Sequence, residues 1–232
     1  MRQGFAKNSQ NQENRITVPG FVHASAQDWG TGRRDPSSKN LGFTRRPIGE
    51  CCVVRSGSTP SRENSDNYGN GMPWVKTGEV NGREIYETEE LVTEKGIRSS
   101  KLKTFPKGTV LIAMYGQGKT RGQIGRLGVD ATVNQACAAL VAKEGLSSKF
   151  LFEQLKLSYD RLRNLGQGGN QPNLNSGLVK AFEIIVPPIE MQKEFVKQIQ
   201  SLDLLKCQFF DTADKMNALF ASLQQRAFRG GL

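Results

Sequence analysis

The sequence contains a single histidine, His23, among its 232 residues. Histidine is the side chain that most often supplies a general base or a zinc ligand near neutral pH, and His23 lies in a polar stretch without a strand or helix pattern. None of the cysteines are spaced as Cys-x-x-Cys; they are Cys51, Cys52, Cys137 and Cys207. These shortages argue against imidazole-based hydrolysis, a structural zinc site and a disulfide framework. We therefore expect no catalytic residues and no metal ligands.

Long apolar runs are also missing, since only 37% of the residues are hydrophobic. No segment approaches the roughly 20 apolar residues that a membrane span needs, and the first twenty residues are too polar for a signal peptide. These absences predict a cytoplasmic protein without a membrane partner. The low apolar content also indicates a modest core, with part of the chain outside it.

Positive charge is in excess, with 32 Lys and Arg against 22 Asp and Glu. Residues 1–46 hold eight basic and three acidic residues and show no periodicity, so we predict a disordered leader, either a linker remnant or a basic arm that touches nucleic acid. The charges are segregated further along: residues 79–94 contain six acids, and residues 95–126 contain eight basic residues and no acid. Such a basic field attracts polyanions, although an ordinary solvated face would look the same.

Strand-like segments recur between residues 47 and 188, with turn residues between them. The best candidates are residues 50–54, 73–80, 108–114 and 135–142. Leucines recur on one helical face of residues 149–165, and Ser148 stands before them as a candidate N-cap. This content predicts an α+β protein whose residues 47–188 form one mixed α/β domain.

The composition changes after Pro187 and Pro188: residues 189–229 contain neither glycine nor proline. One long helix is predicted there, within a third segment of residues 189–232. Apolar residues recur along it at spacings of three and four for about four heptads, as in a coiled-coil seam; they are Phe195, Leu202, Leu205, Phe209, Met216, Leu219 and Leu223. The alternative is a helix that folds back on its own domain, where only its first turns would find cover.

Residues 108–120 are similar to a strand that leads into a phosphate-binding loop. That loop requires glycine where this chain has Ala113, with four residues between that position and Gly118-Lys119-Thr120. Glycines at 122, 125 and 128 also interrupt the helix that should follow. A nucleotide-binding enzyme is therefore retained only as an alternative, and no cofactor is expected.

Three polar loops say more about function than the similarity to a phosphate-binding loop. Residues 115–121 are predicted to form a short exposed loop that combines a tyrosine, a glutamine, a lysine, a threonine and an arginine between glycines. Such groups contact phosphates and base edges. Residues 166–175 are dense in Asn and Gln, which pair with adenine in the major groove, although turn formation and an N-cap at Asn175 explain part of this composition. A third polar loop, residues 56–62, could add phosphate contacts.

Taken in order, these segments resemble one half of the specificity subunit of type I restriction-modification enzymes. The resemblance covers roughly residues 47–232. It rests on the segments 57–62 (GSTPSR), 73–78 (PWVKTG), 111–122 (LIAMYGQGKTRG), 134–136 (NQA), 168–175 (GGNQPNLN), 185–192 (IVPPIEMQ) and 219–232 (LFASLQQRAFRGGL).

The resemblance implies a target-recognition domain that reads a few base pairs of double-stranded DNA, followed by a long helix. In that family the pair occurs twice in one chain, and the two helices form an antiparallel coiled coil that spaces the half-sites and binds modification subunits. Those subunits methylate adenine, and a separate restriction subunit cleaves DNA. We therefore expect a non-catalytic DNA-binding protein whose contacts are Arg62, Lys76, Thr77, Tyr115, Gln117, Lys119, Thr120, Arg121, Gln171 and Asn173.

This chain departs from the family pattern because it contains one recognition domain and one long helix. Two explanations remain open: a half-subunit that homodimerises and reads an inverted repeat, or the C-terminal half of a longer or split subunit. Either way, the seam is expected to pair with a second copy or with the missing half. A scaffold that binds DNA without sequence preference is the other alternative.

Overall fold

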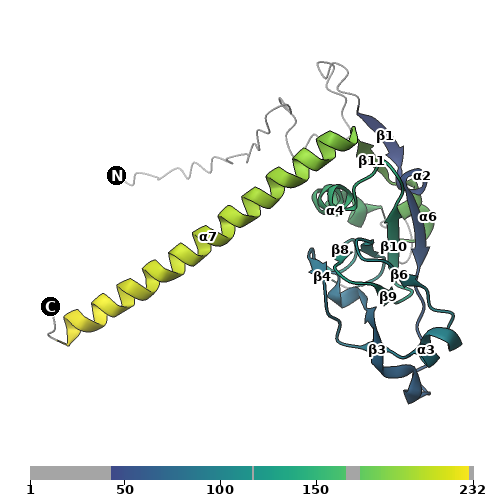
Figure 1. The fold of residues 1–232 in the computed structure, drawn as a ribbon, viewed down its shortest axis with the longest axis horizontal. Coiled ribbons are helices and arrows are strands. Elements are labelled where there is room, and N and C mark those ends of the chain that lie inside the picture. Colours follow the sequence, from purple (N-terminus) through teal and green to yellow (C-terminus); the bar gives the residue numbers. More distant parts are fainter. Residues whose placement is uncertain (1–42, 117, 166–172, 230–232) are drawn as a thin grey trace, which may run out of the picture.

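The computed structural model describes residues 43–116, 118–165 and 173–229 (Figure 1). The predictions for residues 1–42, Gln117 and Gln171 lie outside these residues. Strands and short helices form one body, and the last helix leaves it and projects far to one side (Figure 1). The predicted fold class, a mixed α/β domain followed by a long C-terminal helix, is confirmed.

Three sheets make up the body. The largest has the strand order β2-β10-β7-β8-β4, formed by Cys52–Ser56, Cys137–Ala142, Val110–Ala113, Ile124–Leu127 and Glu84–Ile85. The second has the order β5-β3-β9-β6, formed by Leu91–Val92, Tyr68–Val75, Ala131–Val133 and Thr104–Phe105. Strands β1 (Thr44–Pro47) and β11 (Glu183–Val186) form an antiparallel ribbon. The pairs β3 with β9 and β4 with β8 are parallel, so the sheets are mixed.

The described helices are short except for the last one. They are α2 (Ile48–Cys51), α3 (Glu94–Ser99), α4 (Ser148–Leu157), α5 (Tyr159–Asn164), α6 (Ser176–Ala181) and α7 (Ile189–Phe228), with 3-10 turns η1 (Ser65–Asn67) and η2 (Thr77–Glu79). None of these helices, α7 included, has the combination of length and apolarity needed to cross a membrane.

The prediction of a single helix over residues 149–165 is wrong. The helix breaks at Ser158, whose hydroxyl donates to the carbonyl oxygen of Gln154 at 3.0 Å. Such a bond back to the preceding turn competes with regular helix geometry. The N-cap is Ser147 rather than Ser148, because the Ser147 hydroxyl accepts the N–H of Phe150. The N-cap predicted at Asn175 is confirmed, since its Oδ1 accepts the N–H of Leu178 at 2.9 Å.

The four predicted strands are present with shifted ends. Strand β2 starts at Cys52 because residues 48–51 form the helical turn α2. Strand β3 ends at Val75 because residues 77–79 form η2. Strand β1 begins at Thr44, so the domain boundary predicted at residue 47 falls inside the β1 and β11 ribbon.

Two cores lie on opposite faces of the five-stranded sheet. Strand β7 is buried on both faces: Val110 and Ile112 join a core with residues of α4, α5 and α6, and Leu111 and Ala113 join a core with residues of the second sheet. Burial on both faces explains why β7 is a continuous apolar run rather than an alternating one.

The base of α7 is anchored in the body of the protein. Gln192 is fully buried, and its amide bonds the N–H of Ser147 at 2.8 Å and the carbonyls of Gly145 and Pro187 at 2.9 and 2.7 Å. The sequence spacing places Phe195 on the coiled-coil seam, which is wrong: Phe195 is 7% exposed and packs edge-on against Phe150, with ring centroids 5.5 Å apart. The other seam residues are exposed, by 40% at Leu202 and 74% at Phe209.

Candidate nucleic-acid interface

One end of the five-stranded sheet gathers the predicted contact segments. Ala138 pairs with Ser56 and Cys137 pairs with Ala113, so β2 and β7 end where β10 begins. The connections that leave these strands must therefore emerge side by side. We call this end of the sheet the loop end; it carries residues 57–62, the described residues of the 114–122 loop and residues 134–136.

Backbone hydrogen bonds tie further segments to the loop end. The N–H of Leu174 donates to the carbonyl of Met114 at 3.1 Å, which brings Asn173 beside the start of the 114–122 loop. The N–H of Asn134 donates to the carbonyl of Val75 at 2.9 Å, which places Lys76 and Thr77 next to residues 134–136. Segments far apart in the sequence, such as residues 57–62 and 173–174, thus share one surface.

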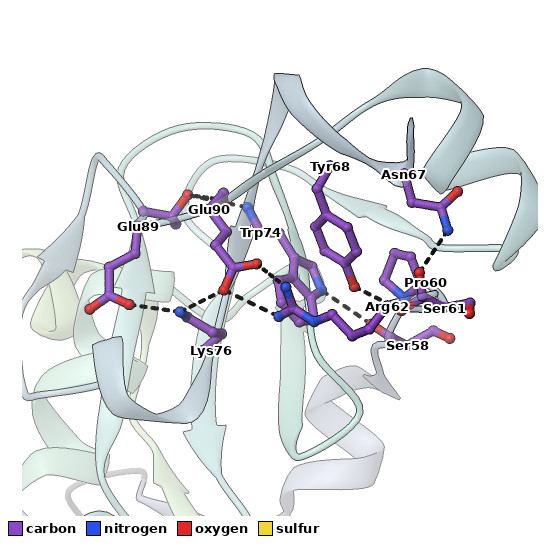
Figure 2. Close-up of polar contacts among 11 residues, drawn as sticks. Ser58, Pro60, Ser61, Arg62, Asn67, Tyr68, Trp74, Lys76, Glu89 and Glu90 are labelled. Carbon is purple, nitrogen blue, oxygen red and sulfur yellow. Dashed lines mark hydrogen bonds and ion pairs between the residues drawn. The ribbon is translucent and has the colours of Figure 1, made fainter. Parts of the chain in front are cut away.

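The 57–62 loop is held rigidly. The carbonyl of Val133 accepts the N–H of Ser58 at 3.1 Å, and a Cβ on Gly57 would lie 1.6 Å from that carbonyl oxygen, so only glycine fits there. Three side chains donate to carbonyls of the loop: Trp74 Nε1 to Ser58 at 3.1 Å, Tyr68 Oη to Pro60 at 2.7 Å and Asn67 Nδ2 to Ser61 at 2.9 Å (Figure 2).

Arg62 and Lys76 converge on a single carboxylate (Figure 2). Arg62 donates two hydrogen bonds to Glu90, at 2.5 and 3.1 Å, and its guanidinium lies 4.3 Å from the centre of the Tyr68 ring. Lys76 Nζ donates to Glu90 at 2.9 Å and to Glu89 at 2.7 Å. Hydrogen bonds from Arg62 and Lys76 lower the pKa of Glu90 to about 2. Two cations and two carboxylates therefore balance within this cluster.

The 114–122 loop is exposed at Tyr115, Gly118 and Lys119, with Tyr115 at 40%. The prediction that the exposed part extends to Arg121 is wrong, because Arg121 is only 8% exposed. The loop turns inward there: the N–H of Gly122 donates to the carbonyl of Ala113 at 2.8 Å. Thr120 is half-buried.

Helix α5 braces the exposed part of this loop. Tyr159 Oη donates to the carbonyl of Lys119 at 2.8 Å, and the guanidinium of Arg163 donates to Tyr159 Oη at 2.9 Å. The backbone of Arg163 also lies so close to Gly122, 3.3 Å from a Cβ built there, that a side chain at 122 would crowd it. Lys119 is thereby presented on a supported backbone.

Sequence reasoning did not include Gln135 among the contacts, although it lies in the 134–136 segment of the resemblance. It is exposed at the loop end, and its Oε1 accepts the hydroxyl proton of Thr59. No local pattern marks this position, because the two residues are 76 positions apart. The described part of the chain contains no group of three His, Cys, Asp or Glu side chains placed to hold a metal ion.

The sequence also matches a known protein family. The model of the family "Type I restriction modification DNA specificity domain" matches residues 40–209, which is most of the chain. This chain belongs to that family. The matched region therefore includes β1, the whole body of strands and short helices, which we call the recognition body after the family description, and the first half of α7.

Curated relatives agree with the family assignment. This specificity-domain protein is 27% identical over 192 residues to the type I restriction enzyme MjaIX specificity subunit of Methanocaldococcus jannaschii, covering 79% of this chain and 41% of the relative. It is 25% identical over 164 residues to the EcoR124I/EcoR124II specificity subunit of Escherichia coli, covering 69% and 41%.

Solved structures share the fold. The HsdS subunit of Thermoanaerobacter tengcongensis superposes with a TM-score of 0.59 at 21% identity, over 87% of this chain and 47% of that one. A chain from a structure of type I restriction-modification complex assembly superposes with a TM-score of 0.64 at 21% identity, over 87% and 48%. This specificity-domain protein thus spans less than half the length of each of these relatives.

Proposed function

We propose that this chain is a non-catalytic, sequence-specific DNA-binding subunit of a type I restriction-modification system, and that its loop end reads one half of a bipartite target. The observation that carries the proposal is the convergence of the polar loops on one end of the five-stranded sheet. Loops on a rigid scaffold are the usual place for recognition residues, and here their backbones are braced from several sides.

The exposed groups at the loop end suit duplex DNA. Lys119 offers a cation for a phosphate, and Tyr115 and Gln135 offer a ring and an amide for bases. Thr77, Thr120 and Asn173 are half-buried in the same region and remain proposed contacts, as do Arg62 and Lys76. Arg121 is better explained as a support of the loop, because it is buried.

The exposed apolar seam of α7 supports the second part of the proposal. We infer that it pairs with the seam of a second copy or of a missing half-subunit, and that the resulting coiled coil docks methyltransferase subunits and, through them, a restriction subunit. Identical apolar stripes are satisfied by two-fold self-pairing, which favours a homodimer for the isolated chain.

The test of DNA recognition uses two lysines at opposite ends of strand β7. Lys119 follows the strand at the loop end, and Lys107 precedes it; both are exposed. Each is changed to alanine in the full chain, and duplex affinity is measured by fluorescence anisotropy across salt concentrations.

We expect Lys119→Ala to weaken binding to every duplex and to reduce the slope of log affinity against log salt by about 1, the value for one phosphate contact. Lys107→Ala should leave both quantities unchanged. Equal losses in the two variants would instead indicate a diffuse basic surface without a reading end.

A further inference from the structure

Gln135 occupies the centre of the loop end, and the backbone on both sides of it is fixed. The carbonyl of Ala136 accepts the N–H of Met114 at 2.8 Å. The side chain of Asn134 accepts the N–H of Ala136 at 3.1 Å, and the carbonyl of Asn134 accepts the N–H of Cys137 at 3.2 Å. Gln135 is exposed in this tight turn, whereas Asn134 and Ala136 are half-buried.

The orientation of that side chain is also determined. The hydroxyl of Thr59 donates to Gln135 Oε1, and Thr59 belongs to the loop that Trp74, Tyr68 and Asn67 hold in place. A β-branched side chain is stiff about χ1, so its hydroxyl is a well-defined anchor. None of the hydrogen bonds found among the described residues involves Gln135 Nε2, and the residue is exposed, so both of its N–H donors are available to a ligand.

We propose that Gln135 reads a base and that Thr59 is the residue that positions it. This inference deepens the proposed DNA-binding function and rests on it. A carboxamide pairs with adenine in the major groove, donating from Nε2 to N7 and accepting from N6 at Oε1. A carbonyl oxygen has two lone pairs, so Oε1 accepts from Thr59 and from adenine together. Because the amide is already oriented, binding orders no free rotor and the cost of recognition falls.

The competing explanation is that Gln135 merely fastens the 57–62 loop through Thr59. The two explanations differ in what they affect. A fastening role changes stability and leaves the preferred sequence alone, whereas a reading role changes the preferred base at one position. The identity of the selected base is therefore the deciding measurement.

The experiment selects binding sites from a random duplex pool with the full-length wild type and with Gln135→Ala, Gln135→Glu, Thr59→Val and the control Gln208→Ala. Gln208 is an exposed amide on α7. Melting temperatures are recorded for all five proteins.

We expect the wild type to require adenine at one position of its site. Gln135→Ala should lose that preference, with discrimination falling roughly 5-fold to 150-fold, at an unchanged melting temperature. Gln135→Glu should shift the preference to cytosine, because a carboxylate accepts from cytosine N4 and donates nothing. Thr59→Val should weaken the adenine preference partially, and Gln208→Ala should match the wild type.

The same sequence selected by the wild type and by both Gln135 variants would overturn the reading role, with or without a lower melting temperature. An unaltered Thr59→Val alongside an altered Gln135→Ala would overturn the positioning role of Thr59. Failure of the wild type to enrich any sequence would contradict the proposed function itself, so the two failures are distinguishable.

Discussion

At the residue scale, Glu90 forms ion pairs with two of the predicted DNA contacts. It accepts hydrogen bonds from both Arg62 and Lys76, and it stands just before β5, whereas its partners follow β2 and β3. The carboxylate therefore links three segments of the recognition body. Its pKa of about 2 lies below the ordinary value of 4.5, so the bonds favour the ionised form in the folded state.

The stability of the fold in acid should depend on Glu90. A carboxyl with a depressed folded-state pKa stabilises the fold above its unfolded pKa, and this contribution is lost as pH falls from about 4.5 to about 2. We expect Glu90→Gln to lower the free energy of unfolding at pH 7 and to flatten its decline across that window, as measured by urea denaturation. Glu94→Gln is the control, because the pair of Glu94 with Arg98 is almost fully exposed. Parallel pH profiles for Glu90→Gln and the wild type would refute this role.

At the scale of the element, α7 depends on its first turn. Pro187 and Pro188 stop the preceding strand and start the helix, and Gln192 then bonds three backbone groups at the edge of the first core. Such bonds direct the helix away from the body rather than across it. Phe195 completes the anchor by packing on Phe150.

We expect Gln192→Ala to destabilise the recognition body by about 1 to 3 kcal/mol, because the carbonyl of buried Pro187 and the N–H of half-buried Ser147 lose their partner. Gln200→Ala, two turns further along on the exposed side, should change stability by less than about 0.5 kcal/mol. Equal effects, measured by urea unfolding followed through tryptophan fluorescence, would mean that the helix is not anchored by Gln192.

At the scale of the whole molecule, helix α7 exposes a stripe of large apolar side chains to solvent. Helix α7 has 40 residues, and from Leu202 onward its large apolar side chains are exposed, including 66% of Met216 and 61% of Leu219. A helix of this length extends about 60 Å, most of it beyond the reach of its own body. Its exposed apolar seam is the surface that we propose to pair with a second chain.

Leu205→Glu should dissociate the proposed dimer, because it buries a charge in the middle of the seam. The melting temperature of the recognition body should stay unchanged, since Leu205 lies outside both cores. Light scattering gives the mass, and Gln225→Glu serves as a control outside the predicted seam. A wild type that is monomeric at all concentrations would contradict self-pairing of the seam.

Much of the architecture was predictable because it depends on neighbours in the sequence. The apolar run of β7, the absence of glycine and proline from 189 to 228 and the N-cap at Asn175 are local signals, and each produced the expected element. The errors also have local causes. Apolar periodicity considers only the type of each residue. It therefore did not predict the Ser158 hydrogen bond that divides the 149–165 helix, nor the burial of Phe195 against Phe150.

The sequence by itself determined the fold class, the long helix with its seam and the polar composition of the loops, because helix and strand formation follow from the spacing of apolar residues. Only the tertiary structure decided which loops meet, that Arg121 turns inward, that Glu90 bonds Arg62 and Lys76, and that Thr59 bonds Gln135. These contacts depend on strand order and register. Register is set by how the two cores pack as a whole, and no single segment encodes it.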